Sequence, residues 1–503
     1  MPSPVRTVAR QPGRLLLPSL CLVVMTLTIL QTMVIPIVGT IGTQLHVSTT
    51  AAGWVLTANL LAAVVATPII GKLADLHGKR PVLLAVLGLV LVGTLISAFT
   101  HSLAFLIVGR VLQGVSYALF PIALAILRDE MPPHKLVGSM AILSGTLGVG
   151  GGFGLVLTGL LTADGADYHR VFWLTAVFVV VTLVLAWFGL PARPRSGTGT
   201  VDWVGALLLA IGLILLFLAL TQGRSWGWAS ALTIGCAVVG AATLAVWWIF
   251  ERRIPAPLVA PRLLTHGPLL ATNIATLFIG IAMFVSFLSS SYFVQTPREI
   301  AGYGFSADVL SASVVYLLPG AVVGVIAASC AGALIRRFGG RRVLISGAVI
   351  GFFGFVFVAV FHEFSWQIIV GTMVVNIFVS FAFASIPNLL MAEVSARDTG
   401  VANSVNSIVR TVGTSIASAL LTTMLATYTI SGTAIPLEAV FVFAFAAGAI
   451  ACVVVACAAG AIRVVPRDSN DASTFTGNPT DAASQDQGKH RETAASGALA
   501  EDC

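Results

Sequence analysis

The ten residues GKLADLHGKR, numbered 71 to 80, decide how this chain folds, because they join two long apolar segments through a short charged turn. Two glycines allow a tight turn at a membrane face, and an aspartate lies near the start of the next helix. Such an aspartate can pair with a base or a helix N-terminus and so hold one arrangement of a helix bundle. A plain loop of positive charge would explain the bases but not the spacing of the glycines. We therefore predict a conformational latch made of Gly71, Asp75, Gly78, Lys79 and Arg80.

The composition around this turn is that of a protein surrounded by lipid. Of 503 residues, 57% are hydrophobic and only 9% are charged, and the mean hydropathy is +0.98. A soluble domain has roughly a quarter of its residues charged, so the composition excludes an ordinary soluble protein. In a soluble protein the net charge of +7 would suggest nucleic acid as a partner. Here the placement of the charges along the chain explains the excess better.

Apolar runs separated by charged or Gly/Pro-rich breaks predict fourteen membrane-spanning helices, since one span needs roughly 20 apolar residues. Six come first, at about 15 to 39, 51 to 70, 82 to 100, 103 to 127, 136 to 161 and 171 to 190. Two more follow, near 203 to 221 and 230 to 250. The last six lie at about 269 to 294, 308 to 332, 343 to 361, 366 to 392, 400 to 427 and 438 to 462.

Lysine and arginine fix the orientation of these spans, because short cytoplasmic loops hold an excess of both. With a cytoplasmic N-terminus, 22 of the 27 basic residues fall in inner segments, three in outer loops and two inside spans. The chain therefore has an even number of spans and both termini in the cytoplasm. The first span is too long for a signal peptide and is expected to stay uncleaved. The six cysteines have no metal-ligand or disulfide spacing, and we interpret them as packing residues.

A weak internal repeat divides the chain into halves. GKLADLHGKR reappears as GALIRRFGGR from Gly332 to Arg341, an offset of 261, and Gly138 matches Gly400 at an offset of 262. Glu130 likewise matches Glu393. Transporters often consist of such repeats with the substrate site between them. We predict a cytoplasmic N-terminus (1–14), a six-helix bundle (15–190), a linker with two inserted helices (191–268), a second bundle (269–462) and a disordered cytoplasmic tail (463–503).

Arg110, in the segment LIVGRVLQG, is the first of two basic residues inside spans. At 1.5 Å per residue it would lie about 13 Å from the outer end of its helix. A charge at that depth is costly unless it faces the bundle interior or a hydrated cavity, which indicates a functional residue. Gln113 lies on the same face and can share its hydrogen bonds. The alternative is an arginine that extends outward to the interface.

The second basic residue inside a span is Arg410, in the thirteenth expected helix, with Asn403 and Asn406 on nearby turns. It predicts a polar, cationic wall of a central cavity, and the alternative is a structural tie to backbone carbonyls. In the fifth helix, Gly150, Gly154 and Gly159 allow a neighbouring helix to approach closely. Their role is either to seal the cavity or simply to pack two helices.

Several kinds of site are missing from the sequence. No Asp or Glu falls in the middle of a span, and all eight histidines lie in loops, connectors or the tail. Proton-coupled pumps usually need a titratable group within the membrane, so the sequence assigns no coupling residue. There is no phosphate-binding loop for ATP, no metal-ligand spacing and no nucleophile constellation, and we expect neither cofactor nor metal.

The turn GKLADLHGKR, the segment LIVGRVLQG and the glycine series resemble three signatures of the major facilitator superfamily. Fourteen helices with a central inserted pair are similar to its fourteen-span drug:proton antiporter branch, the relatives of multidrug and quaternary-ammonium exporters. The resemblance covers nearly the whole chain up to the tail. It implies a latch at residues 71 to 80, a proton-linked network at Arg110 and an antiporter signature at Gly150, Gly154 and Gly159. It also matches Arg410 to an arginine that follows an Asn in such exporters.

The chain departs from this pattern at three points. Leu155 stands where the antiporter signature has a proline, and Thr158 replaces one of its paired glycines. The first helix has Gln31 and Thr32 where many of these exporters have an acidic residue. These departures affect the expected proton coupling and direction of transport, not the fold.

The sequence thus predicts an all-α integral membrane protein of the cell membrane, with a major facilitator fold of two six-helix bundles plus two inserted helices. We expect a monomeric secondary transporter that exports small hydrophobic or amphiphilic molecules, such as drugs and antibiotics, in exchange for protons, with no nucleic acid as partner. Substrate would bind among Phe, Trp and Met side chains, and the charges near the cavity favour neutral or anionic amphiphiles. The expected proton and substrate network comprises Gln31, Arg110, Gln113, Asn406 and Arg410.

Three alternatives stay open at this point. The first is a transporter whose substrate is an endogenous metabolite or a lipid. A membrane-embedded lipid-modifying enzyme would need catalytic residues gathered in a large loop, and the loops here are short. A non-transporting sensor or scaffold would tolerate charge reversal at Asp75 and substitution of Arg110.

Overall fold

The structure is a computed structural model that describes residues 13–161, 167–192, 202–254, 257, 259, 265, 267–394, 399–433 and 435–462. In these residues the regular secondary structure is helical, apart from one isolated antiparallel bridge between Thr429 and Pro436. The described part up to Ile462 forms one compact unit. The expected tail and most of the expected N-terminal segment lie outside the described residues, and the predicted domain boundaries stay predictions.

The helices of the first half precede an inserted pair. They are α1 (Leu16–Thr32), α2 (Val38–Gln44), α3 (Thr49–His77), α4 (Lys79–Phe99), α5 (Leu103–Gly114), the 3₁₀ turn η1 (Val115–Ala118), α6 (Leu119–Glu130), α7 (Pro133–Leu161) and α8 (His169–Gly189). The inserted helices are α9 (Trp203–Trp226) and α10 (Ala231–Glu251).

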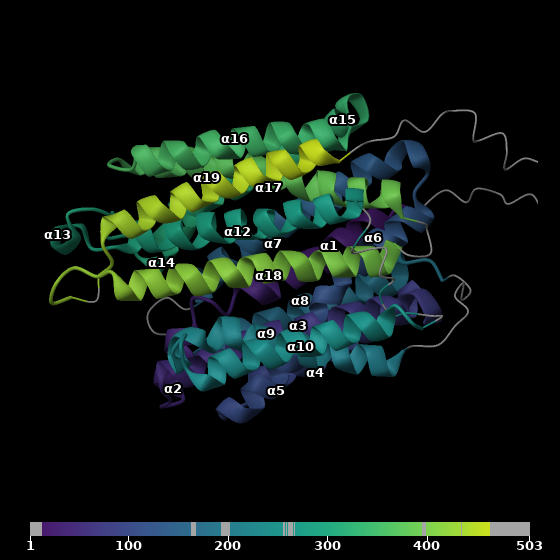
Figure 1. Ribbon diagram of the computed structural model, residues 1–503, viewed down its shortest axis with the longest axis horizontal. Coiled ribbons are helices and arrows are strands. Elements are labelled where there is room, and N and C mark those ends of the chain that lie inside the picture. The colour runs from purple at the N-terminus through teal and green to yellow at the C-terminus, as the bar shows by residue number, and fades with distance from the viewer. Residues whose placement is uncertain are drawn as a thin grey trace, which may run out of the picture. The chain divides into compact units, whose positions relative to one another are not determined.

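The helices of the second half follow the same order. They are α12 (Gly267–Gln295), the short α13 (Arg298–Ala301) and α14 (Val309–Ser311), the π-helical segment η3 (Ala312–Leu317), α15 (Leu318–Phe338), α16 (Gly340–Val360), α17 (Ser365–Glu393), α18 (Thr399–Thr427) and α19 (Glu438–Ala461). The long helices run side by side, and α2 and α13 lie at the same end of the bundle, on the left in Figure 1.

Thirteen of the described helices are long and apolar enough to cross a membrane. The expected many-spanning helical fold is therefore confirmed. The expected first span, 15 to 39, is divided in the structure: α1 has 17 residues, and α2 begins only after a turn that contains Pro36. Proline lacks the amide hydrogen that an uninterrupted helix needs, which accounts for the break. The fourteenth span stays a prediction.

Glycine makes the tight turns at the cytoplasmic ends of both halves. Gly78 separates α3 from α4 at φ +98°, and Gly339 separates α15 from α16 at φ +83°. Residues with a Cβ rarely adopt such angles, so these two positions require glycine. A single glycine can therefore connect the antiparallel helices α3 and α4, and another connects α15 and α16.

The basic residues that follow these turns, Arg80 and Arg341, are 261 positions apart and make similar contacts. Arg80 Nη2 donates to Trp187 O of α8 at 2.7 Å, and Arg341 Nη2 donates to Gly460 O of α19 at 2.5 Å. Each arginine thereby caps carbonyls near the C-terminal end of the last helix of its own half, where a positive charge is favourable.

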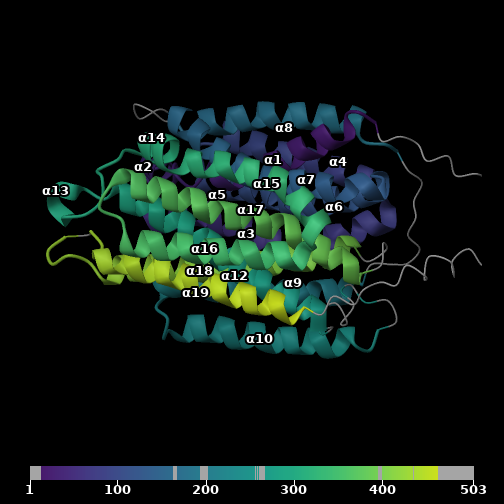
Figure 2. The same ribbon diagram turned by 90° about the horizontal axis from the view of Figure 1, so that it is seen from above.

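The inserted helices lie on one side of the bundle. Helix α9 packs on α3 of the first half and on α18 of the second, and α10 packs on α9 at the edge, as Figure 2 shows. Apolar side chains face outward all around the described helices, for example Phe188 at 75%, Phe99 at 66% and Phe443 at 65% exposure. Large exposed apolar surface of this kind is stable in hydrocarbon and not in water.

Candidate functional site

Arg110 lies in the interior of the first half, on α5, with only 1% of its surface exposed. Its Nε donates to Val55 O at 3.1 Å, and its Nη1 donates to Leu30 O at 3.3 Å and to Gln113 Oε1 at 2.6 Å. Gln113 Nε2 in turn donates to Thr94 Oγ1 at 3.0 Å. The guanidinium therefore joins α5 to α1 and α3, and Gln113 joins it to α4. Arg110 points into the bundle and does not extend outward to the interface.

Arg410 has a different environment, although it also lies on a membrane-spanning helix. It is half-buried, and its Nη2 donates to Ser407 Oγ at 3.2 Å. Its guanidinium carbon lies 5.7 Å from the ring centroid of Phe120 on α6 and 5.2 Å from that of Phe383 on α17. These are cation–π distances, so the charge is held between rings that come from the two halves of the chain.

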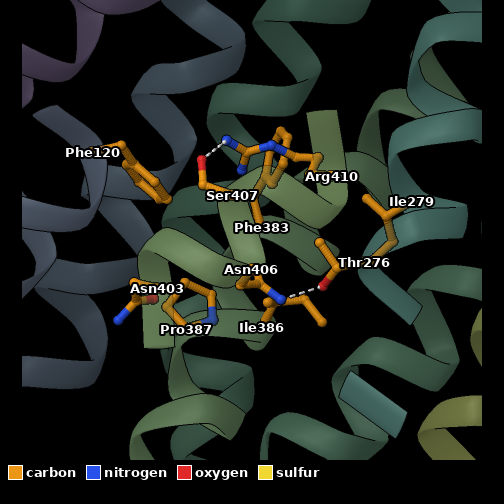
Figure 3. Close-up of a pocket in the computed structure, with 10 residues that line it drawn as sticks. All are labelled: Phe120, Thr276, Ile279, Phe383, Ile386, Pro387, Asn403, Asn406, Ser407 and Arg410. Atoms are coloured by element: carbon orange, nitrogen blue, oxygen red, sulfur yellow. Dashed lines mark hydrogen bonds between the residues drawn. The ribbon is translucent and has the colours of Figure 1, made fainter. Parts of the chain in front are cut away.

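A narrow pocket opens beside Arg410, with free space for roughly one water molecule in this conformation. Figure 3 shows the side chains around it, with Phe120 on the opposite side from Thr276 and Ile279. The lining residues are Phe120, Thr276, Ile279, Phe383, Ile386, Pro387, Asn403, Asn406, Ser407 and Arg410. Phe120 is the one lining residue from the first half, and the others belong to α12, α17 and α18.

The length of the helices puts the pocket at about mid-membrane depth. Phe120 and Phe383 each lie ten residues before the cytoplasmic ends of their helices, Glu130 and Glu393. At 1.5 Å per residue this is about 15 Å, half of the roughly 30 Å hydrocarbon thickness. Transporters built from repeats bind their substrates at this depth between the halves.

One wall of the pocket is polar but uncharged. Asn406 Nδ2 donates to Asn273 Oδ1 at 3.0 Å and to Thr276 Oγ1 at 2.8 Å, which ties α18 to α12. Of the predicted network, Arg410 and Asn406 therefore line the pocket together. Arg110 and Gln113 lie elsewhere in the first half, and Gln31 is half-buried on α1.

Tyr117 lies near both arginines and interacts electrostatically with each. It belongs to η1, the short 3₁₀ turn between α5, which carries Arg110, and α6, which carries Phe120. A 3₁₀ stretch inside a long helix often marks a hinge or a functional site. Tyr117, Phe120, Phe383 and Thr276 were not predicted from the sequence, where Phe and Thr in apolar runs are indistinguishable from packing residues.

The predicted latch residues divide into two groups in space. The Asp75 carboxylate lies at the beginning of α18, where a Cβ added to Gly400 would be 2.8 Å from Asp75 Oδ1. A Cβ added to Gly71 would be 2.5 Å from Ser404 Oγ, also on α18. Asp75 and Gly71 therefore join the two halves at their cytoplasmic ends, and the carboxylate is close to a helix N-terminus, which favours negative charge.

Lys79 and Arg80 stay within the first half. Lys79 Nζ pairs with Asp129 and donates to Ala125 O at 3.3 Å, while Arg80 binds α8 as described above. A second connection between the halves comes from Arg128, whose Nη2 donates to Val394 O at 3.1 Å and Met391 O at 3.4 Å. Arg128 was not among the predicted latch residues.

The glycines of α7 contact two different neighbours. A Cβ at Gly150 would lie 2.9 Å from Met25 O, and one at Gly154 would lie 3.2 Å from Ile29 Cα, so both pack directly on the backbone of α1. Gly159 instead faces Leu310 of the second half. Thr158, where a glycine was expected, is buried with its Oγ1 2.8 Å from Gly154 O and 3.2 Å from Met33 O.

The outer end of the first half carries a polar cluster at the start of α8. Asp167 Oδ1 accepts from the backbone N–H of His169 at 3.0 Å and also contacts its ring, whose Nε2 lies 2.8 Å from Thr100 O. Burial works against ionisation of Asp167, but these hydrogen bonds outweigh it and lower the pKa of the carboxyl. Among the described residues no group of three or more His, Cys, Asp or Glu side chains could hold a metal ion.

Comparison with protein families and named proteins gives a consistent result. The chain matches the model of the Major Facilitator Superfamily over residues 20–221 and 198–418. It is 27% identical over 372 residues to multidrug resistance protein 3 of Bacillus subtilis, covering 72% of this chain and 69% of that protein. It is 28% identical over 374 residues to the uridine/deoxyuridine transporter of Lactococcus lactis, covering 71% and 75%. Over 314 residues it is 29% identical to the tetracenomycin C resistance and export protein of Streptomyces glaucescens, covering 61% and 56%.

Solved structures agree in fold. The human organic anion transporter TETRAN superposes with a TM-score of 0.60 at 14% identity, covering 90% of this chain and 98% of that one. The nucleoside transporter NupG superposes with a TM-score of 0.54 at 14% identity, covering 89% and 100%. At this identity the likeness concerns the arrangement of the helices alone.

Proposed function

The chain belongs to the major facilitator superfamily, and from this premise we propose that it exports small hydrophobic or amphiphilic molecules by alternating access, in exchange for protons. It is a multi-pass plasma-membrane transporter and not an enzyme, since the relatives and structural neighbours reported above are transporters. This removes the alternative of a lipid-modifying enzyme.

The observation that carries the proposal is the pocket between the halves at mid-membrane depth. Its first-half wall is Phe120, and its second-half walls carry Phe383 and Arg410. Rocking of one half against the other separates Phe120 from Arg410 and changes the surface that a ligand contacts. A ligand then binds the two arrangements with different affinity, which is what moves a two-state equilibrium.

The predicted latch fits this motion. Asp75 and Gly71 on α3 contact α18, the helix that carries Arg410, at its cytoplasmic end. We propose that this contact and the Arg128 bonds close the cytoplasmic side and break when the pocket opens inward. Gly150 and Gly154 keep α7 fixed on α1, so that the first half moves as a rigid body.

Inverted membrane vesicles test the proposal with a lipophilic fluorescent dye and an imposed proton gradient. We expect dye accumulation in vesicles that contain the protein, its loss on adding an uncoupler, and at least a severalfold reduction with Phe120→Ala. Phe353→Ala is the matched control, because Phe353 is 63% exposed on the outside of the bundle. Dye accumulation that continues unchanged after the uncoupler is added would refute proton exchange. An unchanged rate of accumulation with Phe120→Ala would refute the assignment of this pocket as the substrate site.

A second candidate function is export of an endogenous metabolite. It is favoured by the uncharged hydrogen-bonding wall of Asn406 and Thr276, together with the likeness to a nucleoside transporter. In the same vesicles, competition of dye accumulation by uridine at low concentration would favour this candidate, and the absence of competition would count against it.

A further inference from the structure

The charge of Arg410 is not neutralised by a carboxylate in the described part of the chain. Among the described residues its side-chain hydrogen bond is to Ser407 Oγ, and its other partners are the rings of Phe120 and Phe383. A guanidinium has five N–H donors in a planar fork, so most of the hydrogen-bonding capacity of this one is left over. The ten lining residues include no Asp and no Glu.

The titratable groups around Arg410 do not supply the missing negative charge. Tyr117 carries a neutral phenol at physiological pH, and Arg110, which also interacts with Tyr117, is a second positive charge and not a negative one. Arg110 donates three hydrogen bonds of its own, to Val55, Leu30 and Gln113. A pocket of low dielectric with one fixed positive charge and no acidic lining favours an anion.

The aromatic rings add a second requirement. Phe120 and Phe383 flank the guanidinium, and Ile279, Ile386 and Pro387 continue the apolar surface away from it. A small inorganic anion would contact the guanidinium but would leave this apolar surface uncovered. A ligand with an apolar or aromatic body and an acidic head satisfies both parts of the pocket, since a planar carboxylate matches the guanidinium fork.

Resting on the transport function proposed above, we infer that this pocket, widened as the halves rock apart, selects anionic amphiphiles, with a carboxylate bound by Arg410 and an aromatic or apolar body against Phe120 and the apolar residues of the second half. The substrate itself supplies the counter-charge that the protein lacks at this site. Compounds with an ammonium head group are excluded by like-charge repulsion.

Binding to the purified full-length protein in lipid nanodiscs tests the inference with three fluorescent probes that share one aromatic body. Dansylglycine carries a carboxylate, dansylglycinamide is neutral, and dansylethylenediamine carries an ammonium group. Empty nanodiscs correct for partition into lipid. We expect dansylglycine to bind about ten- to hundredfold more tightly than the amide, the range for a hydrogen bond to a charged group, and the ammonium probe to bind least.

Variants separate the role of charge from that of geometry. Arg410→Gln should remove the preference for dansylglycine, and Arg410→Lys should retain part of it, because lysine keeps the charge but not the fork. Arg342→Gln is the control, since Arg342 is exposed at the start of α16, and it should leave all three affinities unchanged. Because the probe series is measured on the unsubstituted protein first, the test stands even if an Arg410 variant fails to fold.

Three outcomes would overturn the inference: equal affinity for the carboxylate and the amide, preference for the ammonium probe, or displacement of dansylglycine by millimolar acetate alone. Each of them would leave the transport proposal intact if a neutral dye is still exported in the vesicle assay. Failure of export for every compound, with dansylglycine still bound, would instead refute the proposed function.

Discussion

Replacing Arg110 by leucine should destabilise the protein far more than the same replacement at Arg410. Arg110 is 1% exposed and donates three hydrogen bonds, to two backbone carbonyls and to Gln113 Oε1. At about 1.5–3 kcal/mol for each bond from a charged donor, the gross loss is about 5–9 kcal/mol. Relief of the several kcal/mol needed to bury a guanidinium offsets part of this, which leaves a net loss of about 3–5 kcal/mol.

Arg410→Leu removes one hydrogen bond and two cation–π contacts from a half-buried side chain, a gross loss of about 2.5–5 kcal/mol, roughly half of that for Arg110. The measurement is the fraction of detergent-purified protein that remains monodisperse by size-exclusion chromatography after heating. We expect a midpoint about 5 °C or more below that of the unsubstituted protein for Arg110→Leu and a clearly smaller change for Arg410→Leu.

A double-mutant cycle attributes the loss to the network. Adding Gln113→Leu to Arg110→Leu should cost less than Gln113→Leu alone, with a coupling of about 0.5–3 kcal/mol, because the two side chains bind each other. If Arg110→Leu melts at the same temperature as the unsubstituted protein, or if the two substitutions are additive, Arg110 does not hold the first half together and the reasoning is wrong.

Three further predictions concern the latch, the glycines and the outer end. Asp75→Asn removes a negative charge at the N-terminus of α18, an interaction worth about 0.3–2 kcal/mol. Because this contact is proposed to close the cytoplasmic side, a cysteine introduced in the pocket as Ser407→Cys should then react faster with an impermeant maleimide added from the cytoplasmic side. An unchanged reaction rate would contradict the latch. Gly154→Ala should lower stability by about 1–3 kcal/mol through overpacking on α1, whereas Gly148→Ala, with open space around it, should not; equal melting temperatures would refute the packing argument. Asp167 has a lowered pKa, so its ionised form stabilises the fold at neutral pH and this stabilisation is lost as the pH falls below about 4. Asp167→Asn should therefore melt below the unsubstituted protein at pH 7, and the difference should shrink as the pH falls below about 4; a difference that stays constant would argue against the charge.

Much of the fold was predictable because lipid imposes simple rules on a chain. Long apolar runs must become helices, since no water is available inside the bilayer for free backbone groups. Tight glycine turns were visible in GKLADLHGKR and GALIRRFGGR, and Gly78 and Gly339 do adopt positive φ. The break of the first span at Pro36 was missed, because the run from 15 to 39 is apolar on both sides of the proline.

The candidate site was predictable only in part. A cationic residue inside a span is rare enough to be noticed, which is how Arg110 and Arg410 were found. From the sequence, both arginines were assigned to one proton and substrate network. In the structure Arg110 has three hydrogen-bond acceptors within the protein, whereas Arg410 lines a pocket. Hydropathy does not distinguish the face of a helix that points to lipid from the face that points inward, because both are apolar.

By itself, the sequence determined that the chain is a membrane-spanning helical protein, and it predicted two related halves with one arginine inside a span of each. Which residues from the two halves meet was decided by tertiary structure alone. Phe120 reaches Arg410 across 290 positions, and Asp75 reaches the beginning of α18 at Gly400. Such contacts depend on how each helix is rotated and packed against its neighbours, and no local pattern of residues records that rotation.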